Sequence, residues 1–581
     1  MEGIIQKIKN SKDIIFIVFA IIILSILKQY LVQGFPIIAY VMAGEDDALM
    51  VKFAYSILDG NWLGEYAYNT LMKGPTFPMF LALLYKLKLP YIFSITSLYT
   101  ISCIVFMIGI RKMIKNKYAF IGFFTILLFN PIMYGSNIMQ RIYRNSLIPS
   151  FALLITGSYI ALFLRRNEKT RFSIVWSLIA GVSLSAFYYT REDSMWIVPF
   201  VLFMTLSIII AKIITEKKIN LELILKIVIT IIPIICLILF GKYISLKNEE
   251  YYGLRTKNVL TESNFTAALN SIYSVKPEKR VDCVTVTQEK VDRMAEASPS
   301  FATIAPKLHE TIGSFGRLDR KPDDSEVEDG WILWAIRIAV MESGYRTFAA
   351  EQDIYEKIAN ELNKAMETGV LERQRVMPSP MMSPYRKEYT LDLLKTLGKC
   401  IKFVATFDTL SISNKDISTD NEALFDYVKG FENISGERSL YPEDSKYAEE
   451  LEQEKYIKSL DVRTNILNGL VKLYCIFGII SGIIGITYYI VLTITIIKEI
   501  YHKKNDNIQK WIIISALLGA LITLIVGVSY NHVATCYSIM YLYLCGAYPL
   551  YIAFSSFCVY NAFIELYEKV KLKNNNIIEN E

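Results

Sequence analysis

Charged side chains lie beside long apolar segments at four places in the sequence, and their types suggest acid–base chemistry and anion binding. The first place is Gly44-Glu45-Asp46-Asp47. Neighbouring carboxylates repel one another, and together with partial burial this raises at least one pKa, which suits a general base or a metal ligand. Acidic residues also favour helix N-termini, so the alternative is a solvated amphipathic helix over 46–58. Asp46 and Asp47 are therefore candidate catalytic residues.

The second place is the segment Lys73-Gly74-Pro75-Thr76, where glycine and proline predict a turn before an apolar helix. A lysine at a helix N-terminus is unfavourable for the helix itself. It is favourable for binding phosphate, because the ammonium group and the helix N-terminus both attract an anion. Lys73 is thus either a phosphate ligand or an interfacial anchor.

The third and fourth places carry arginine. They are Gln140-Arg141-Ile142-Tyr143-Arg144-Asn145 and Thr190-Arg191-Glu192-Asp193. A guanidinium group can bind phosphate through two parallel hydrogen bonds, so we expect Arg141, Arg144 and Arg191 to contact a phosphate. Glu192 would orient Arg191 or help to hold a metal ion. The alternative is a local ion pair, such as Arg191 with Glu192 or with Asp193.

The elements that must position these residues are membrane-spanning helices. Hydrophobic residues make up 53% of the 581-residue chain and charged residues 20%, and long stretches of the chain carry no charge. A spanning helix needs about 20 apolar residues, because the hydrocarbon layer is about 30 Å thick. The sequence predicts ten spans: 14–33, 91–110, 118–140, 145–164, 172–190, 194–211, 219–245, 473–497, 511–531 and 533–564.

Clusters of Lys and Arg between the spans predict the orientation. All of them fall on one side of the membrane if Thr76–Leu89, which has only 14 residues and contains two lysines, is not a full span. Basic loops are retained in the cytoplasm. We therefore expect a multi-pass protein of the cell membrane with both termini in the cytoplasm and all four charged places on the outer side.

This topology divides the chain into three parts. Residues 1–245 form a membrane core with seven spans and the outer catalytic loop, 246–471 form an extracytoplasmic soluble insert, and 472–581 carry three spans and a cytoplasmic tail. The insert should be mostly helical, because stretches such as Asp353–Gly369 place apolar residues at helical spacing before a glycine. Cys283 and Cys400 lie in this insert, and a disulfide between them is left open.

The order of the motifs resembles that of the type C membrane glycosyltransferases (GT-C), which include protein O-mannosyltransferases and lipid A aminoarabinose transferases. Those enzymes have an outer-loop acid, a Lys/His-Pro-Pro-Leu turn and a later Thr-Arg-Pro-Glu-Gly loop. The corresponding residues here are Asp46-Asp47, Lys73-Gly74-Pro75-Thr76 and Thr190-Arg191-Glu192-Asp193-Ser194, within residues 14–245. The resemblance implies that Asp46 or Asp47 is the catalytic residue, which would act as a base. The insert departs from the family pattern, in which soluble domains more often come after the last helix, and this leaves the acceptor open.

The resemblance implies transfer of a sugar from a polyprenyl-phosphate donor to an extracytoplasmic acceptor, which could be a cell-wall polymer, a glycolipid or a protein. One base and a cationic clamp on the departing phosphate suffice for a single inverting displacement. The motifs indicate no particular cofactor and leave the need for a divalent cation open, and no nucleic-acid partner is expected at a net charge of +6. The alternatives are a polytopic transporter and a membrane assembly or sensor protein with an extracytoplasmic binding domain. Charge-free helix centres and the lack of a repeat argue against a transporter.

Overall fold

The chain is an all-α polytopic membrane protein. The computed structural model describes residues 2–216, 220–281, 284–314, 326–374, 385–502, 507–535 and 540–578. Within these ranges, nine helices are long and apolar enough to cross a membrane. They are α1 (Glu2–Val32), α4 (Tyr91–Ile110), α7 (Ile148–Leu164), α8 (Thr170–Tyr188), α9 (Val198–Glu216), α10 (Leu221–Tyr252), α20 (Gln453–Tyr501), α21 (Ile508–Thr535) and α23 (Ala547–Ile578).

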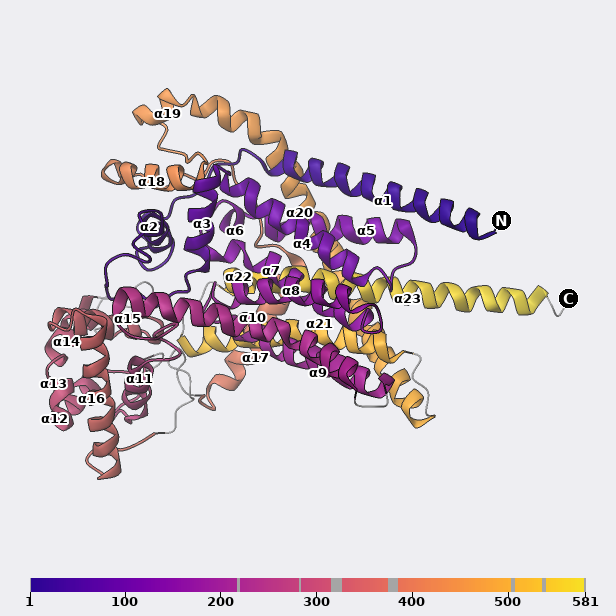
Figure 1. Ribbon diagram of the computed structural model, residues 1–581. Coiled ribbons are helices and arrows are strands. Elements are labelled where there is room, and N and C mark those ends of the chain that lie inside the picture. The colour runs from indigo at the N-terminus through magenta and orange to yellow at the C-terminus, as the bar shows by residue number, and fades with distance from the viewer. Residues whose placement is uncertain are drawn as a thin grey trace.

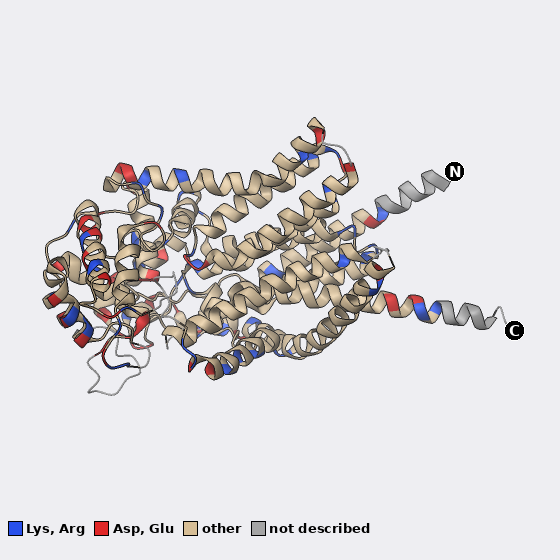
Figure 2. Ribbon diagram, turned by 90° about the horizontal axis from the view of Figure 1, so that it is seen from below, with Lys and Arg blue, Asp and Glu red and all other residues tan. Residues whose placement is uncertain are grey.

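These helices form one bundle whose two ends differ (Figure 1). Both chain termini project from one end, which we call the terminal end, and the helices between α10 and α20 cover the other, the insert end. Charged residues gather at the two ends and are sparse along the middle of the bundle (Figure 2). This distribution fits a bilayer around the middle, because charges at membrane depth are costly.

Helix α7 lies at the centre of the bundle, where close packing fixes its position. A methyl group built on Gly157 would lie 2.6 Å from the Cα of Phe106 on α4, and one on Gly109 would lie 2.5 Å from the carbonyl oxygen of Gly157. Glycines of this kind let two backbones approach closely in a membrane. Since α7 begins directly after the Arg144 segment, this contact also fixes the third charged place.

The predicted continuous span over 118–140 is wrong. Helix α5 (Lys117–Leu128) stops before Asn130, whose side chain accepts a hydrogen bond from the backbone of Ile132. Pro131 then removes a backbone donor and disfavours helical geometry in the residue before it. The chain still crosses the bundle, because Lys117 pairs with Asp13 near the terminal end and residue 141 reaches the insert end. Irregular backbone is tolerated at this depth because it is buried in protein.

Helix α3 (Thr76–Leu87) confirms the interpretation of that segment as too short for a full span. It packs against α2 (Asp47–Leu58), also at the insert end. Each of these short helices begins directly after a loop that carries charged residues of the candidate site. Their place beside the ends of the long helices holds those loops at the rim of the bundle.

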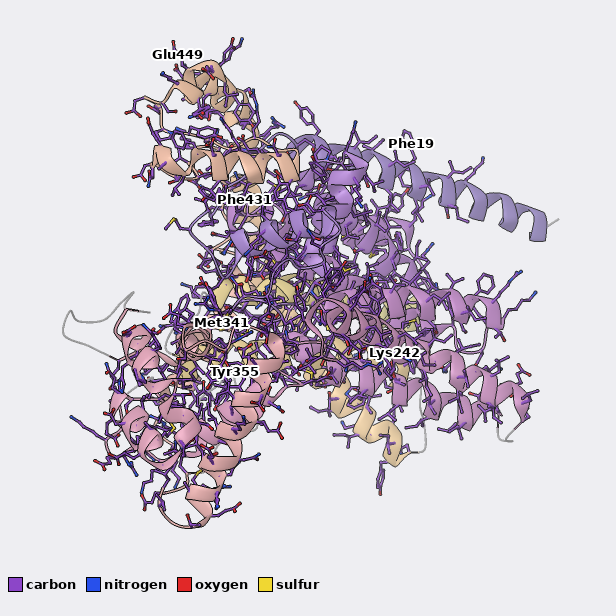
Figure 3. The ribbon with its side chains drawn as sticks, turned by 60° about the vertical axis from the view of Figure 1, so that its left-hand side comes forward. Phe19, Lys242, Met341, Tyr355, Phe431 and Glu449 are labelled. Carbon is purple, nitrogen blue, oxygen red and sulfur yellow. The ribbon has the colours of Figure 1, made fainter. Side chains whose placement is uncertain are left out.

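The helices of the insert form two groups at the insert end, one around Met341 and Tyr355 and one around Phe431 and Glu449 (Figure 3). The larger group comprises α11 (Asn264–Ser274), α12 (Gln288–Ala297), α13 (Pro299–Ala302), α14 (Ala305–Ser314), α15 (Asp329–Glu342) and α16 (Phe348–Glu367). The smaller comprises α18 (Phe425–Ser435) and α19 (Lys446–Glu450). The described part of the insert is thus mostly helical, as predicted.

One helix from this region, α17 (Tyr389–Thr406), packs mainly against the long helices α20, α21 and α23. The proposed boundaries after residues 245 and 471 both fall inside continuous helices, α10 and α20. Cys400 on α17 has a free, buried thiol, and Cys283 lies outside the described residues.

Candidate active site

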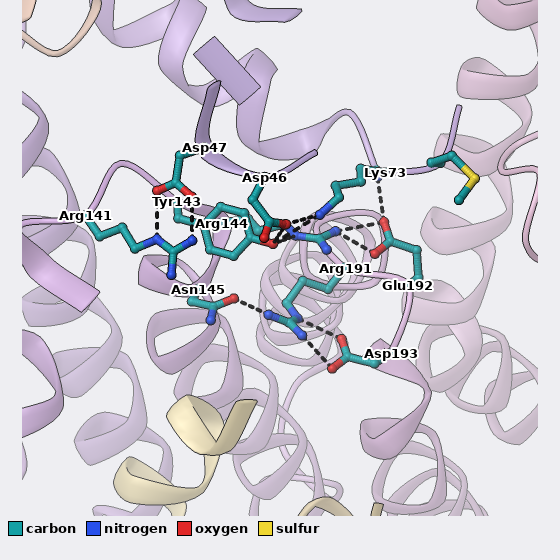
Figure 4. Close-up of polar contacts among 12 residues, drawn as sticks. Asp46, Asp47, Lys73, Arg141, Tyr143, Arg144, Asn145, Arg191, Glu192 and Asp193 are labelled. Carbon is teal, nitrogen blue, oxygen red and sulfur yellow. Dashed lines mark hydrogen bonds and ion pairs between the residues drawn. The ribbon is translucent and has the colours of Figure 1, made fainter. Parts of the chain in front are cut away.

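All seven candidate residues lie together at the insert end (Figure 4). They are Asp46, Asp47, Lys73, Arg141, Arg144, Arg191 and Glu192. Asp46, Lys73, Arg144 and Glu192 are joined through Tyr143 into one network of ion pairs and hydrogen bonds, and the Asp47–Arg141 and Arg191–Asp193 pairs lie beside it. Four separate segments supply them: the loop before α2, the turn before α3, the segment before α7 and the turn after α8. Each segment directly adjoins a packed helix, and this is why residues far apart in the sequence can meet.

Asp46 is the accessible acid of the site. It stands at the N-cap position of α2 but makes no side-chain capping bond there. Its Oδ1 instead forms an ion pair with Lys73 and accepts a hydrogen bond of 2.7 Å from the Tyr143 hydroxyl. Its side chain is 42% exposed, whereas that of Lys73 is 8% exposed. The alternative of a simple helix start therefore does not account for Asp46.

The two neighbours of Asp46 decide its charge. Burial on its own would raise the pKa of this carboxyl, but Lys73 and the Tyr143 hydroxyl hold the pKa well below its usual range. Asp46 is therefore ionised at neutral pH, and it can accept a proton readily only if Lys73 is drawn away from it.

Asp47 has a different environment. Its side chain is fully buried and accepts two hydrogen bonds from Arg141, at 2.7 and 2.5 Å. Burial raises the pKa of Asp47 to about 6, although Arg141 opposes the shift. Arg141 bonds both carboxylate oxygens of Asp47, and this contact joins α2 to the segment before α7. Because it is buried and bonded in this way, the Asp47 carboxylate is not accessible to a substrate hydroxyl.

Arg144 and Glu192 form the second ion pair of the site. One guanidinium nitrogen of Arg144 lies 2.8 and 2.6 Å from the two Glu192 oxygens, and another donates to the Tyr143 hydroxyl at 3.1 Å. Glu192 also accepts a hydrogen bond of 2.9 Å from the backbone of Gly74. A side chain at Gly74 would collide with Tyr189, since its Cβ would lie 2.0 Å from that carbonyl oxygen. The glycine thus allows the Lys73 turn to rest on the end of α8.

Arg191 is held by Asp193 and not, as predicted, by Glu192. Its guanidinium bonds both Asp193 oxygens, at 2.7 and 2.8 Å, and also contacts the Asn145 side chain. Consecutive side chains in this turn point in different directions, so Glu192 faces Arg144 instead. Asp193 raises the pKa of Arg191 against the effect of burial, so the guanidinium stays charged. The local ion pair named as the alternative is present for Arg191 with Asp193.

Tyr143 and Asn145 were not singled out from the sequence, although both lie inside the quoted motif Gln140–Asn145. The Tyr143 hydroxyl contacts Asp46, Lys73 and Arg144 and so lies at the centre of the network. The position of Tyr143 between two arginines in the sequence could have indicated its place in the site. Trp334 also lies near the site, with its ring 5.9 Å from Lys73 Nζ. It comes from α15 of the insert, and nothing in its local sequence indicates this contact.

The insert also contacts the loop that carries Lys73. It does so through another buried ion pair, between Arg337 and Glu351. Both side chains are fully buried, and their closest atoms are 2.9 Å apart. Arg337 also donates to the Thr70 carbonyl at 3.0 Å and to the Tyr66 hydroxyl at 2.7 Å. The position of Lys73 therefore depends on α15 and α16 as well as on the membrane helices.

The donor set of the site does not resemble a metal centre. Among the described residues, no group of three or more His, Cys, Asp or Glu is placed to hold an ion. Three of the site's four acids pair with an arginine and Asp46 pairs with Lys73. The site thus holds four cationic side chains, each paired with one carboxylate.

No protein family matches the sequence, and no curated protein does either. A solved structure that matches is ArnT from Cupriavidus metallidurans in the apo state, with 10% sequence identity and a TM-score of 0.29. The match covers 91% of this chain and 78% of that chain. At this identity, function has to be inferred from the residues of the site themselves.

Proposed function

We propose that this protein is a membrane glycosyltransferase of the GT-C type that transfers a sugar from a polyprenyl-phosphate donor to an acceptor hydroxyl. The observation that carries the proposal is a half-exposed carboxylate, Asp46, beside four cationic side chains at one end of a membrane bundle. The order of the sequence motifs supports the same reaction. A lipid-linked donor suits this place, because its chain would remain in the bilayer while its phosphate reaches the bundle end.

The proposed step is a single displacement at the anomeric carbon. Asp46 takes the proton from the acceptor hydroxyl as the acceptor oxygen forms its bond to that carbon. The bond between the carbon and the phosphate oxygen breaks, and its electron pair leaves with the phosphate. Lys73, Arg144 and Arg191 stabilise the charge that develops there. The configuration at the anomeric carbon is inverted, and no second carboxylate has to act as a nucleophile.

Exchange of ion pairs prepares this step. A buried cation is stable only when it is paired, so each cation would be neutralised by a carboxylate while no donor phosphate is bound. Asp46 pairs with Lys73, Glu192 pairs with Arg144, and Asp193 pairs with Arg191. A donor phosphate would compete for Lys73, and loss of that ammonium would raise the pKa of Asp46 toward that of a useful base.

Asp47 and Arg141 have a structural role in this proposal. Their two-bond contact is buried, and Arg141 is also covered by the rings of Tyr40 and Tyr143, at 4.7 and 4.6 Å. The sequence motifs made both acids candidates for catalysis and Arg141 a candidate for phosphate binding. The buried contact favours different roles for Asp47 and Arg141. Asp46 alone is the proposed base, and the Asp47–Arg141 pair fixes the loop that presents it.

The insert end would face the outside of the cell and the termini the cytoplasm. The donor would then be a polyprenyl-phosphate sugar of the outer leaflet, and the acceptor a cell-wall polymer, a glycolipid or a protein. Helices α2 and α3, which follow two loops of the site, lie between the two groups of insert helices (Figure 1), so an acceptor from outside would meet these groups at the site.

The test is release of polyprenyl phosphate by the purified full-length protein from a polyprenyl-phosphate sugar. We expect Asp46→Asn to lower turnover by about 10²- to 10⁴-fold, the usual contribution of a general base. The matched control is Asp59→Asn, at the C-cap of the same helix α2. Full turnover in Asp46→Asn would reject the assignment. Binding of the donor without any release of polyprenyl phosphate would instead favour a transporter or a sensor.

A further inference from the structure

Helix α17 belongs to the insert in sequence but to the membrane bundle in space. A methyl group on Gly478 of α20 would lie 2.1 Å from the carbonyl oxygen of Ala405, so the two helices touch. Phe407, just past the end of α17, packs against the rings of Tyr474 and Tyr548, with centroids 5.6 and 5.4 Å apart. Figure 1 shows α17 beside the long helices and apart from α11 to α16.

These contacts lie at the level of the membrane surface. About 20 helical residues cross the hydrocarbon layer. Counted from Lys498, the basic residue near the terminal end of α20, that length ends close to Gly478. Counted from Lys569 of α23, it ends close to Tyr548. The C-terminal part of α17 therefore touches the bundle where the hydrocarbon layer gives way to lipid headgroups.

The sequence of α17 presents three faces. Its buried face is formed by Thr396, Cys400 and Val404, which are four residues apart and point into the bundle. A second face is apolar but exposed: Leu391 is 62%, Leu394 62% and Ile401 56% accessible. A third, exposed face next to the second carries Lys395, Lys399 and Lys402. Aliphatic and cationic stripes side by side are the pattern of a helix that lies in a membrane interface.

The three lysines on the third face of α17 make only weak ion pairs within the protein. Lys395 lies 3.3 Å from Asp392, and Lys402 lies 3.6 Å from Asp408. Both contacts are exposed, and exposed ion pairs of this kind contribute little. Lys399 has no ion-pair partner among the described residues. The stripe can therefore turn toward phosphate groups outside the protein.

We propose that α17 lies in the headgroup region of the leaflet at the insert end, with its apolar stripe among acyl chains and its three lysines on the phosphates of anionic lipids. The neighbouring helix α20 also exposes apolar side chains at this level, where Ile476 and Ile480 are 60% and 54% exposed. Lipid would thus anchor the insert to the bilayer. It would act close to the site, because Cys400 of α17 touches Met540, three residues from Tyr543, whose ring lies 4.7 Å from Arg191.

The first test locates the apolar stripe. A photoactivatable amino acid is placed at Leu394 or Ile401 in the full-length protein, in nanodiscs that contain phosphatidylglycerol and phosphatidylcholine. Mass spectrometry should find lipid adducts at both positions. The matched control is Val370, 67% exposed at the end of the larger group of insert helices, where no lipid adduct is expected. Cross-links between two copies of the chain, or no adducts at either position, would overturn the proposal.

The second test concerns the lysines. Retention of phosphatidylglycerol relative to phosphatidylcholine is measured by native mass spectrometry. Each lysine near an anionic surface favours binding by about fivefold, so the K395Q/K399Q/K402Q variant should lose most of the preference. The K357Q/K455Q/K458Q variant removes three exposed lysines from α16 and from the start of α20 and should keep it. A preference unchanged in the first variant would overturn the proposal, and neither test depends on glycosyl transfer.

Discussion

At the scale of single residues, the distinction between Asp46 and Asp47 explains how two adjacent acids can do different work. Asp46 is 42% exposed and pairs with Lys73, whereas Asp47 is fully buried between two bonds from Arg141. Removing one partner of a buried pair leaves the other charge unpaired, which is costly. The cost is smaller at the half-exposed Asp46, because water can replace its carboxylate and Lys73 keeps the Tyr143 hydroxyl as a partner. The two positions should therefore respond differently to the same substitution.

Stability should separate the two acids. Asp47→Ala leaves Arg141 buried without its partner and should lower the free energy of unfolding by about 3–5 kcal/mol. Asp46→Ala should have a much smaller effect, and Asp59→Ala, at the end of α2, should change stability by less than about 0.5 kcal/mol. Thermal unfolding in detergent measures the order of the three variants. Equal losses for Asp46→Ala and Asp47→Ala would contradict the assignment of the anchoring role to Asp47.

The pH dependence of turnover tests the ion-pair exchange. The ratio kcat/KM reports the free enzyme and kcat the donor complex. Lys73 holds the pKa of Asp46 below its usual range in the free enzyme, so a loss of Lys73 to the donor should raise it. A base loses activity as the pH falls through its pKa. The acidic limb of kcat should therefore lie at higher pH than that of kcat/KM.

Two variants make the pH experiment specific. Lys73→Met should move the acidic limb of kcat/KM up toward that of kcat, because Asp46 then lacks its ammonium partner in the free enzyme too. Glu45→Gln, at the neighbouring acid bonded to Tyr68, should leave both limbs in place. Acidic limbs that coincide in the unsubstituted protein would show that Lys73 does not change partners.

At the scale of elements, two helices of the insert hold a loop of the membrane core. The pair of Arg337 on α15 and Glu351 on α16 binds the Thr70 carbonyl and the Tyr66 hydroxyl, three residues or more ahead of Lys73. The insert therefore helps to position the residues of the site. The sequence motifs of residues 1–245 alone do not show how Lys73 is held, because Arg337 and Glu351 lie in the insert.

Neutral replacements of this ion pair should separate its role in positioning Lys73 from its contribution to the stability of the protein. Arg337→Met leaves Glu351 buried and unpaired and should cost about 3–5 kcal/mol, whereas Arg337→Met with Glu351→Gln should recover most of it. Neither variant restores the hydrogen bond to Thr70, so the KM for the donor should remain several-fold raised in both. Thermal unfolding and donor KM are the two measurements. A double variant with the original donor KM would show that the pair stabilises the insert only.

At the scale of the whole molecule, the bundle places every residue of the proposed site at one end and both termini at the other. Charged residues are concentrated at these ends and are sparse in the middle (Figure 2). A lipid-linked substrate can meet such a site without leaving the bilayer. The basic residues near the terminal end predict the side of the membrane on which the site lies, because positive loops are retained in the cytoplasm.

Labelling of introduced cysteines in intact cells tests this orientation. Asn61 is exposed and is the suitable position at the insert end, and the exposed Lys115 serves at the terminal end. We expect a membrane-impermeant maleimide to label Asn61→Cys and not Lys115→Cys, with the unsubstituted chain as background. The reverse pattern would invert the topology and place the site in the cytoplasm.

Sequence periodicity and charge were sufficient to determine the membrane class, most of the spans and the seven residues that meet at the site. These properties are local: an apolar segment such as 91–110 has to be helical in lipid, and charges are confined to its ends. Only the tertiary structure decided which acid is exposed, which partner each arginine takes, and that Trp334, Arg337 and α17 adjoin the membrane core. Most of these features depend on contacts between different segments, from 27 positions apart for Asp46 and Lys73 to 267 for Thr70 and Arg337, and the pattern within a single segment does not specify them.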